Sequence, residues 1–267
     1  MRRVAVLAAS GRELAPARAA LGTVDRRRLG SLGYEVGHAG GVEVHLINTG
    51  MGPAAASAAV QSVLSEVALD AVVSTGYAGR LGPGGIGEVI LGTDVRDWTK
   101  GQDGTVFRTD PALLAIAREA AGEAKLAWSE GPVATVDQVL CRADEKRTLA
   151  RASGAIAVDM ESAAIAQAAA AVGVPFLLVR AVSDRASDDL PMDFNLWLTP
   201  WGRMRGIAQM LRRPSILRSL FQMKRQVEQG SQNLARFFQA WMRVLEQDHS
   251  SAYANVPATP PARMGAR

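Results

Sequence analysis

Three short polar clusters follow apolar stretches of this sequence, and each contains a carboxylate. The first is Ser10-Gly11-Arg12-Glu13, the second is Met160-Glu161, and the third ends in Ser183-Asp184. Carboxylates that converge on one site in different environments can divide proton donation and proton acceptance between them. An acidic residue after a strand also commonly caps a helix or lies in its first turn. Spacing alone leaves both interpretations open.

The apolar stretches that precede these clusters are typical of buried strands, and each is followed by a helical pattern. We expect strands at residues 4–9, 42–48, 71–74, 89–94, 155–158 and 176–182, and helices at 13–21, 54–67, 111–124 and 160–172. Small-residue turns are expected at 49–53 and 75–79. This order predicts an α/β fold with a mostly parallel central sheet flanked by helices on both faces. Ligands bind such sheets beyond the carboxyl ends of the strands, where the polar clusters lie.

Composition limits the chemistry that the 267 residues can support. Hydrophobic residues make up 48%, enough for a substantial core. The single cysteine, Cys141, excludes a disulfide framework and fits a reducing compartment, so we expect a cytoplasmic protein. The histidines, His38, His45 and His249, have no paired spacing. We therefore expect no metal and no cofactor.

The net charge of +4 is unevenly distributed along the chain. Residues 1–192 carry 19 Lys and Arg against 22 Asp and Glu, a net of −3, whereas residues 193–247 carry 9 against 3, a net of +6. We predict an α/β domain over 1–192, a basic amphipathic helical segment over 193–247 and a disordered tail over 248–267. The localised charge fits an anionic surface better than a nucleic acid.

Four segments in sequence order resemble the nucleosidase branch of the nucleoside phosphorylase and nucleosidase superfamily. Val158-Asp159-Met160-Glu161 is similar to its ribose-binding signature, and residues 174–184 are similar to the following strand with its Ser-Asp motif. Residues 74–79 with 87–89 resemble the central Thr-Gly-x-Ala-Gly loop, and residues 49–52 resemble the first Gly loop. The resemblance covers about residues 3–190.

The resemblance implies a role for each polar cluster. Asp184 would protonate N7 of a leaving purine with support from Ser183, because a neutral base leaves more easily than an anion. Glu161 would bind the ribose hydroxyls and Met160 would pack on the sugar. The base would contact Val139 and Leu140, and the first of these lacks the aromatic ring common at that position. The remaining substrate-binding residues implied are Gly76, Tyr77, Ala78, Gly79 and Arg180.

Two positions address whether water or phosphate attacks the sugar. Glu13 falls where nucleosidases of this family keep a water-activating glutamate, and Ser74 falls where uridine-phosphorylase-like members keep a phosphate-binding arginine. A carboxylate repels phosphate, so both positions favour hydrolysis. Phosphorolysis remains the alternative, with Arg12 or Arg80 as the group that would bind phosphate.

The C-terminal region resembles that of hopanoid-associated phosphorylase or nucleosidase proteins, in its Leu211-Arg212-Arg213-Pro214 stretch and the helical pattern at 215–247. That resemblance implies conversion of adenosylhopane to ribosylhopane in hopanoid biosynthesis, and Ser10 leaves room for a bulky 5′ group. The expected partners are a purine nucleoside with that group, a second copy in a homodimer and an anionic membrane surface at the inner face of the cytoplasmic membrane.

Phe194, Trp197 and Trp201 lie close together in the sequence near several arginines, a combination that suits such an interface. The other interpretation of residues 215–247 is a closing helix packed on the core or on a partner subunit, and packing on the core would bury Phe238 and Trp241. The alternative function is a methylthioadenosine or adenosylhomocysteine type of nucleosidase. A non-catalytic nucleoside or lipid sensor is disfavoured because Glu13, Glu161 and Asp184 are all present.

Overall fold

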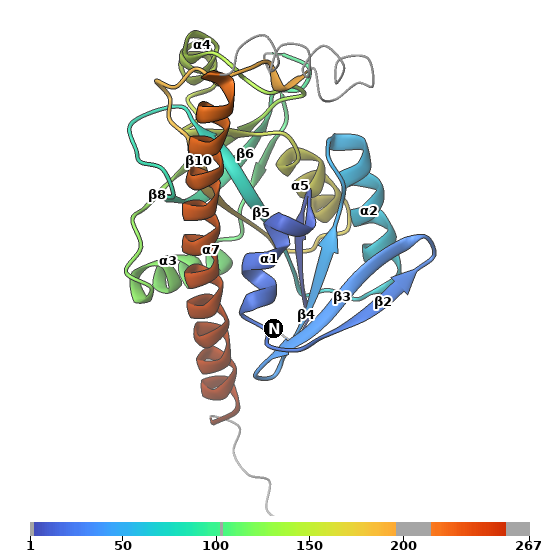
Figure 1. Cartoon of the computed structure of the whole chain (residues 1–267). Helices are drawn as coiled ribbons and strands as arrows, with labels where there is room; N and C mark the ends of the chain where they lie inside the picture. Colours follow the sequence, from blue (N-terminus) through green and yellow to red (C-terminus); the bar gives the residue numbers. More distant parts are fainter. Residues whose placement is uncertain (1–2, 102–103, 196–214, 255–267) are drawn as a thin grey trace, which may run out of the picture.

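The computed structural model describes residues 3–101, 104–195 and 215–254. Short strands alternate with helices along most of the chain, and one long helix follows at the C-terminal end (Figure 1). In chain order the elements are β1 (Arg3–Ala8), α1 (Gly11–Ala19), β2 (Val24–Leu29), β3 (Leu32–Ala39), β4 (Val42–Asn48), α2 (Pro53–Glu66), β5 (Ala71–Arg80), β6 (Val89–Asp97), β7 (Val106–Arg108), α3 (Pro111–Glu123), β8 (Trp128–Thr135), α4 (Ala143–Ser153), β9 (Ala157–Asp159), α5 (Ser162–Ala171), β10 (Phe176–Asp184) and α7 (Ser215–Ala254).

The strands form one sheet with the order β10-β6-β8-β9-β5-β1-β4-β3-β2, and β7 pairs with β6. Strand β10 also pairs with β5, so β5, β10, β6, β8 and β9 close into a ring. Strands β1, β4, β3 and β2 extend from one side of that ring. Strands β1, β5 and β10 are parallel, so their carboxyl ends point the same way. Strand β9 is antiparallel to β5, with Val158 opposite Gly79, so its carboxyl end lies beside the last residues of β5.

The α/β class predicted from the sequence is confirmed, and the sheet itself is mixed. Five of the described strand pairings are parallel, and five are antiparallel. The parallel arrangement holds where helices connect the strands, as in β4-β1-β5-β10. Tight turns at Gly30 and Gly40, both in the left-handed region with φ of 57° and 55°, join β2, β3 and β4. A turn that short permits only antiparallel pairing.

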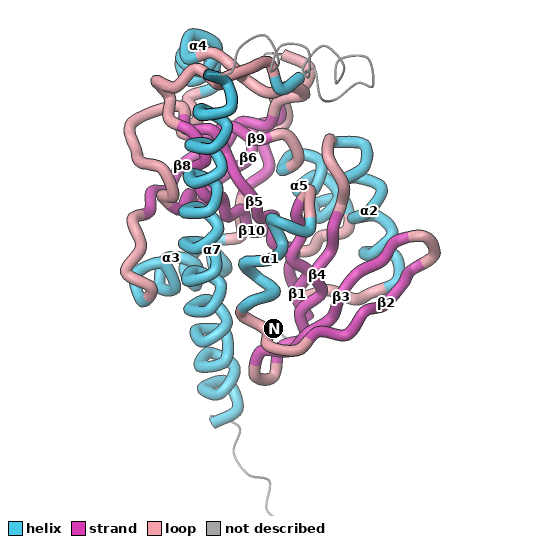
Figure 2. The backbone as a smooth tube through the Cα atoms, in the orientation of Figure 1, coloured by secondary structure: helices cyan, strands magenta, loops and turns pink. Residues whose placement is uncertain are grey.

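Two helical layers cover the sheet, and alternating strand residues supply the two cores. Val4 and Val6 of β1 face the layer that contains α1, α3 and α7. Ala5 and Leu7 of the same strand face the layer that contains α2 and α5. Figure 2 shows α7 running along the length of the molecule beside α1 and α3. Burial on both faces explains why the central strands are almost continuously apolar.

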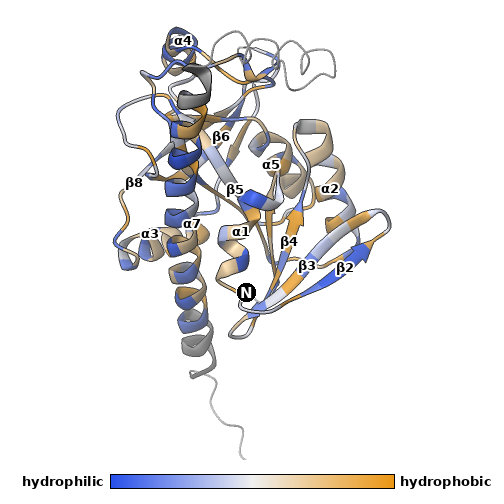
Figure 3. Ribbon diagram, viewed as in Figure 1, coloured by the Kyte–Doolittle hydropathy of each residue, from blue (hydrophilic) through white to orange (hydrophobic). Residues whose placement is uncertain are grey.

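Helix α7 begins at Ser215, where the sequence pattern predicts a helix, and its C-terminal half packs on the core. Phe238 is fully buried with its ring edge-on to those of Phe237 and Trp241. Figure 3 shows hydrophilic residues along the visible face of this helix. Part of the basic segment is thus the closing helix of the fold. Within the described part of the chain, no helix is long and apolar enough to cross a membrane.

The expected turn at residues 75–79 is wrong. These residues continue β5 as far as Arg80 because they pair with β10, with Arg180 opposite Gly76 and Val182 opposite Ala78. Strands β2, β3, β7 and β8 and helix α4 were not predicted. The exposed arginines of β2 mask its strand pattern, and α4 buries few apolar residues. The tryptophans at 197 and 201 and the Leu-Arg-Arg-Pro stretch lie outside the described residues.

Phe238→Ala tests whether α7 stabilises the fold through its buried face. We expect the free energy of unfolding to fall by about 3–5 kcal/mol, because truncating a buried Phe removes apolar contacts and leaves a cavity. Phe221→Ala is the matched control, since Phe221 lies on the same helix with 57% of its surface exposed. Denaturant unfolding followed by circular dichroism measures both. Equal, small effects of the two changes would contradict the packing of α7.

Candidate functional site

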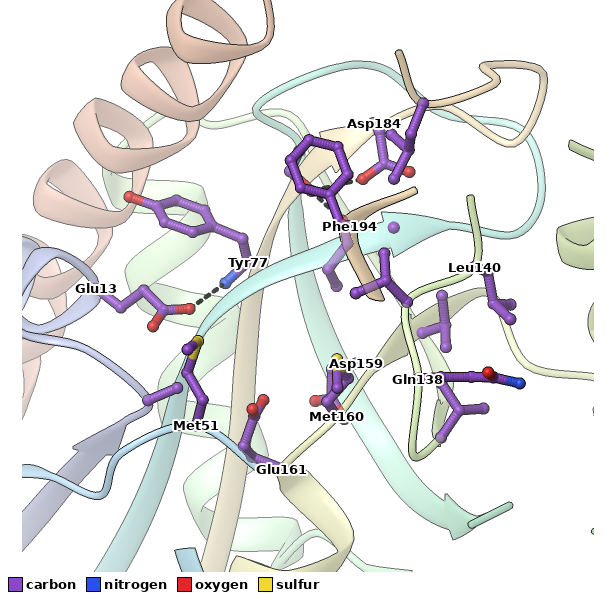
Figure 4. Close-up of a pocket in the computed structure, with 18 of the residues that line it drawn as sticks. Glu13, Met51, Tyr77, Gln138, Leu140, Asp159, Met160, Glu161, Asp184 and Phe194 are labelled. Atoms are coloured by element: carbon purple, nitrogen blue, oxygen red, sulfur yellow. Dashed lines mark hydrogen bonds between the residues drawn. The ribbon is translucent and has the colours of Figure 1, made fainter. Parts of the chain in front are cut away.

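A cavity of about 440 Å³ opens at the carboxyl ends of β1, β5, β9 and β10. Figure 4 shows Glu13 and Asp184 on opposite sides of this pocket, with Glu161 and Met160 on its floor. The lining combines three glutamate or aspartate residues expected from the sequence with a mostly apolar wall. Its lining residues are Ala9, Ser10, Glu13, Met51, Tyr77, Ala78, Gly79, Val136, Gln138, Val139, Leu140, Lys146, Val158, Asp159, Met160, Glu161, Ser183, Asp184, Leu190, Phe194 and Met223.

Glu13 lies in the first turn of α1 and is held by two donors. Ser10, the N-cap of that helix, donates from Oγ to Oε2 of Glu13 at 2.8 Å. The backbone N–H of Tyr77 donates to Oε1 at 3.4 Å. Gly76 permits this approach, because its φ is +145° and a Cβ there would lie 2.7 Å from Oε1. A fixed carboxylate at the cavity wall can accept a proton from a bound water.

Glu161 lies between β9 and α5, and its carboxylate is largely buried. The backbone N–H of Gly52, in the turn after β4, donates to Oε1 of Glu161 at 3.1 Å. Burial, followed by the negative charge of Asp159, raises the pKa of Glu161 to about 7, although the Gly52 N–H and the Arg180 guanidinium act in the opposite direction. This carboxyl group therefore changes charge near neutral pH.

A buried ionic network lies under Glu161 and supports it. Arg180, at 2% exposure, donates from Nε to Oδ2 of Asp159 at 3.0 Å and from Nη2 to Oγ of Ser74 at 2.8 Å. Thr135 donates to Oδ1 of Asp159 at 2.8 Å. Asp159 is thus paired and hydrogen-bonded, as a buried charge must be. This network fixes the end of β9 that carries Met160 and Glu161.

Asp184 ends β10, and both of its carboxylate oxygens accept hydrogen bonds. Ser183 donates from Oγ to Oδ1 at 2.7 Å, and Lys146 donates from Nζ to Oδ2 at 2.5 Å. Gly79 of the neighbouring strand leaves space for this carboxylate, because a Cβ at that position would lie 3.1 Å from Oδ2. A strongly bound carboxylate beside a cation therefore faces the cavity opposite Glu13.

Ten of the twelve expected site residues line the cavity. The two exceptions are Gly76, which faces Glu13, and Arg180, which points into the buried network. Arg180 shares the strand face of Leu178 and Val182, which pack on the α2–α5 layer, so its side chain cannot reach the cavity. The ten that line it are Glu13, Tyr77, Ala78, Gly79, Val139, Leu140, Met160, Glu161, Ser183 and Asp184.

Sequence reasoning missed several lining residues, of which Lys146, Met51 and Met223 matter most. Lys146 comes from α4, which was not predicted, and Met223 comes from α7. Met51 lies in the Gly-rich turn that the sequence predicts at residues 49–53. Its place between a strand and a helix could have marked it as a lining residue. The loop that carries Val139 is fixed by Asn195, whose side chain accepts from the Val139 N–H at 2.7 Å and donates to the Val139 carbonyl at 3.0 Å.

The two arginines considered as phosphate ligands lie elsewhere. Arg12 is exposed and does not line the cavity. Arg80 is buried, where it donates to the Pro83 carbonyl at 2.6 Å and to Ser129 at 2.8 Å and lies near Glu88. Lys146 is the one cationic side chain among the described lining residues. Among residues 3–101, 104–195 and 215–254, no three His, Cys, Asp or Glu side chains gather as a metal site.

The site is a cavity in an α/β fold where acidic side chains from several strands gather, and comparison with known proteins gives the family. The family model for the phosphorylase superfamily matches residues 3–205. The chain belongs to this superfamily. The 5'-methylthioadenosine/S-adenosylhomocysteine nucleosidase of Shewanella putrefaciens is 30% identical over 228 residues, covering 78% of this chain and 97% of the relative. That of Shewanella oneidensis is 28% identical over 224 residues, covering 78% and 95%.

Solved structures share the fold. The 5'-methylthioadenosine/S-adenosylhomocysteine nucleosidase of Neisseria meningitidis, in complex with methylthio-immucillin-A, has a TM-score of 0.73 at 22% identity and covers 92% of this chain and 100% of its own. The futalosine hydrolase of Helicobacter pylori has a TM-score of 0.72 at 19% identity and covers 91% and 97%. The sequence relatives thus lie in the nucleosidase branch that the motifs indicated.

Glu161→Gln tests the buried carboxyl group. The pKa of Glu161 is about 7 in the folded chain against an ordinary value of 4.5, so the folded state binds the proton more tightly. The contribution of Glu161 to the free energy of unfolding should therefore fall as the pH rises from about 4.5 to 7, and this loss remains in full above pH 7. The variant keeps an acceptor for the Gly52 N–H. Its free energy of unfolding should exceed that of wild type by on the order of 1–3 kcal/mol at pH 8 and by little at pH 4.5.

Denaturant unfolding at the two pH values measures this difference. Glu66→Gln, an exposed position on α2, is the control and should show no such pH dependence. An equal difference between wild type and Glu161→Gln at both pH values would be inconsistent with a raised pKa.

Proposed function

We propose that this chain hydrolyses the N-glycosidic bond of a 5′-substituted adenosine and releases adenine. The observation that carries the proposal is one cavity with Glu13 on one side, Asp184 on the other and Glu161 between them. Family membership and the nucleosidase relatives support it.

Each carboxylate takes a different part in the proposed reaction. Asp184 delivers a proton to N7 of adenine as the glycosidic bond breaks, and Ser183 orients it. Glu161 in its ionised form accepts hydrogen bonds from the ribose 2′- and 3′-hydroxyls, and Met160 packs on the sugar. Glu13 takes a proton from the water that attacks C1′. The base lies against Val139 and Leu140.

Water is favoured over phosphate by the charge of the cavity. A phosphate dianion would meet the carboxylates of Glu13 and Glu161, and the arginines at 12 and 80 do not line the cavity. Lys146 is already engaged by Asp184. Ser74 is fully buried beside Arg180 and Ser162, away from the cavity lining. Anion binding would need an uncommitted cation, and the described lining has no cationic side chain besides Lys146.

Adenine release in the presence and absence of phosphate tests this proposal. Wild-type protein with methylthioadenosine should give free methylthioribose at a rate that phosphate does not change. Glu13→Gln should reduce the rate by roughly 10²–10⁴-fold, because an amide cannot accept the proton of the attacking water. Arg12→Gln is the matched control and should leave the rate unchanged. Formation of the sugar 1-phosphate only with phosphate, together with a loss in Arg12→Gln, would establish phosphorolysis instead.

The 5′ substituent of the adenosine has two candidates, a small sulfur-linked group and a hopanoid. The two Shewanella relatives are 5'-methylthioadenosine/S-adenosylhomocysteine nucleosidases, so a substrate with a small thioether or a homocysteine group is the first candidate. A second candidate, adenosylhopane, is favoured by the apolar end of the cavity near Glu13. Met51 is 70% exposed at this end, and Met223 and Phe194 also line the cavity. The small Ser10 side chain leaves this end uncrowded.

Rates with methylthioadenosine, adenosylhomocysteine and adenosylhopane distinguish these candidates. If a large apolar group contacts Met51, then Met51→Ser should lower kcat/KM for that substrate by about 5–30-fold, which corresponds to about 1–2 kcal/mol of lost apolar contact. Unsubstituted adenosine is the control substrate and should respond little. A wild-type rate with adenosylhopane below the assay limit, beside rapid cleavage of methylthioadenosine, would exclude the second candidate.

If adenosylhopane is the substrate, we expect the protein to contact a membrane, because the substrate is a lipid. The N-terminal part of α7, which lines the cavity through Met223, also carries the exposed Phe221, with the Arg225 guanidinium 4.8 Å from the centre of its ring. A basic residue with an exposed aromatic ring fits an anionic interface. Phe238 and Trp241 are excluded from this role because they are fully buried. The proposal therefore concerns the N-terminal part of α7 and the residues that precede it.

A further inference from the structure

Lys146 is a buried cation that the proposed reaction leaves without a role. It lies on α4 with 1% of its side chain exposed, and it lines the cavity beside Asp184. Its Nζ donates to Oδ2 of Asp184 at 2.5 Å and to the backbone carbonyls of Arg185 at 2.9 Å and Asp188 at 3.0 Å. An ammonium group has three hydrogens, and these three acceptors use all of them. The surroundings are thus built for the protonated form.

The carboxylate of Asp184 is arranged as an acceptor on both sides. Oδ2 accepts from Lys146, and Oδ1 lies 2.7 Å from the Ser183 hydroxyl, which also lies 3.2 Å from the Ala78 carbonyl. When the hydroxyl donates to Oδ1, the carboxylate holds no proton that it could give to a leaving base. The proton must reach Asp184 first, and the adjoining Lys146 ammonium is the one cationic donor among the described residues that line the cavity.

We infer that Lys146 is a positioning residue that supplies, through Asp184, the proton that the leaving base receives. The inference rests on the function proposed above. An N–H bond of Lys146 breaks as an O–H bond forms at Asp184. That O–H bond then breaks as an N–H bond forms at N7, while the electron pair of the glycosidic bond moves to the base. Lys146 is left as a neutral amine, which solvent reprotonates after the base departs, and Glu13 takes the proton of the attacking water.

A structural role for Lys146 gives different expectations. The same ammonium group ties Asp184 to the backbone at Arg185 and Asp188, so its removal would disturb the site in any case. A disturbed site would be slow with every substrate. A missing proton matters only when the leaving group needs one. The leaving group is therefore the variable that separates the two roles.

The test compares two substrates that share the 5′-methylthioribose group, one with adenine and one with 4-nitrophenolate as the leaving group. Lys146→Met should lower kcat for adenine release by roughly 10²–10⁴-fold, because adenine must be protonated as it leaves. Nitrophenolate leaves without protonation and does not need the proton of Lys146. The nitrophenyl substrate should lose less than about tenfold, and Asp184→Asn should show the same selectivity. Glu13→Gln should be slow with both substrates. Lys224→Met, on the exposed part of α7, is the control.

Lys146→Arg separates proton supply from charge. A guanidinium keeps the positive charge beside Asp184 but does not release its proton near neutral pH. It should therefore resemble Lys146→Met with adenine and wild type with nitrophenolate, and it carries the test if Lys146→Met does not fold by circular dichroism.

Near-normal adenine release by Lys146→Arg would reduce Lys146 to a fixed charge and overturn the inference. Equal losses with both substrates in folded variants would assign it a structural role. Absence of adenine release by wild-type protein from any 5′-substituted adenosine would instead refute the proposed function.

Discussion

The gathering of four carboxylates around one cavity, two of them buried and two partly buried, is the constraint on which the rest of the site depends. Each is compensated in a different way. Asp159 has a buried arginine, Asp184 has a buried lysine and a hydroxyl, and Glu13 has a hydroxyl and a backbone N–H. Glu161 has one backbone N–H, and burial raises its pKa to about 7. Like charges in a shared low-dielectric region must be separated in this manner, because otherwise they would all favour the neutral form. The division of proton chemistry in the proposed reaction follows from these unequal surroundings.

The parallel pairing of β5 and β10 determines where Arg180 and Ser183 meet the carboxylates of Asp159 and Asp184. Its register sets Gly76 opposite Arg180 and Ala78 opposite Val182, and an irregularity after Val182 brings Asp184 opposite Gly79. The alternation of side chains along β10 then sends Arg180 towards α5 and Asp159. The change of register lets Ser183 and Asp184 turn into the cavity. One pair of strands thus places Arg180 beside Asp159 on one face of the sheet and Asp184 in the cavity on the other side. Glycine is required at position 76, where φ is +145° and a Cβ would lie 2.7 Å from a Glu13 oxygen, whereas at position 79 it gives the Asp184 carboxylate room, because a Cβ there would lie 3.1 Å from Oδ2.

The sequence was sufficient for the α/β class and for the location of three carboxylates. Glu13, Glu161 and Asp184 could be placed at one site because apolar runs mark β1, β9 and β10 and ligands bind beyond the ends of such strands. Their position left helix capping open as the other interpretation, and the roles expected of them came from the family resemblance. Lys146 could not, because its partner Asp184 is 38 positions away in the sequence and α4 has the polar composition of a surface helix. Arg180 shows the opposite error: its motif is adjacent to Asp184, but the period of a strand directs it to the other face. The contacts of Lys146 and Arg180 depend on how segments distant in the sequence are aligned in the fold, which local sequence patterns do not encode.

Helix α7 connects the core to the proton-accepting side of the cavity. From Leu234 onward its buried face belongs to the same core as β1 and β5, whereas Met223 lines the cavity. Between them, Gly230 lets the helix pass close to Tyr77, and the Tyr77 hydroxyl is hydrogen-bonded to Ser231. The backbone N–H of Tyr77 in turn binds Glu13. The position of the carboxylate proposed to activate water therefore depends on how α7 lies. A contact made by the N-terminal part of α7, at a membrane or around a large 5′ substituent, would act on that carboxylate through Ser231 and Tyr77.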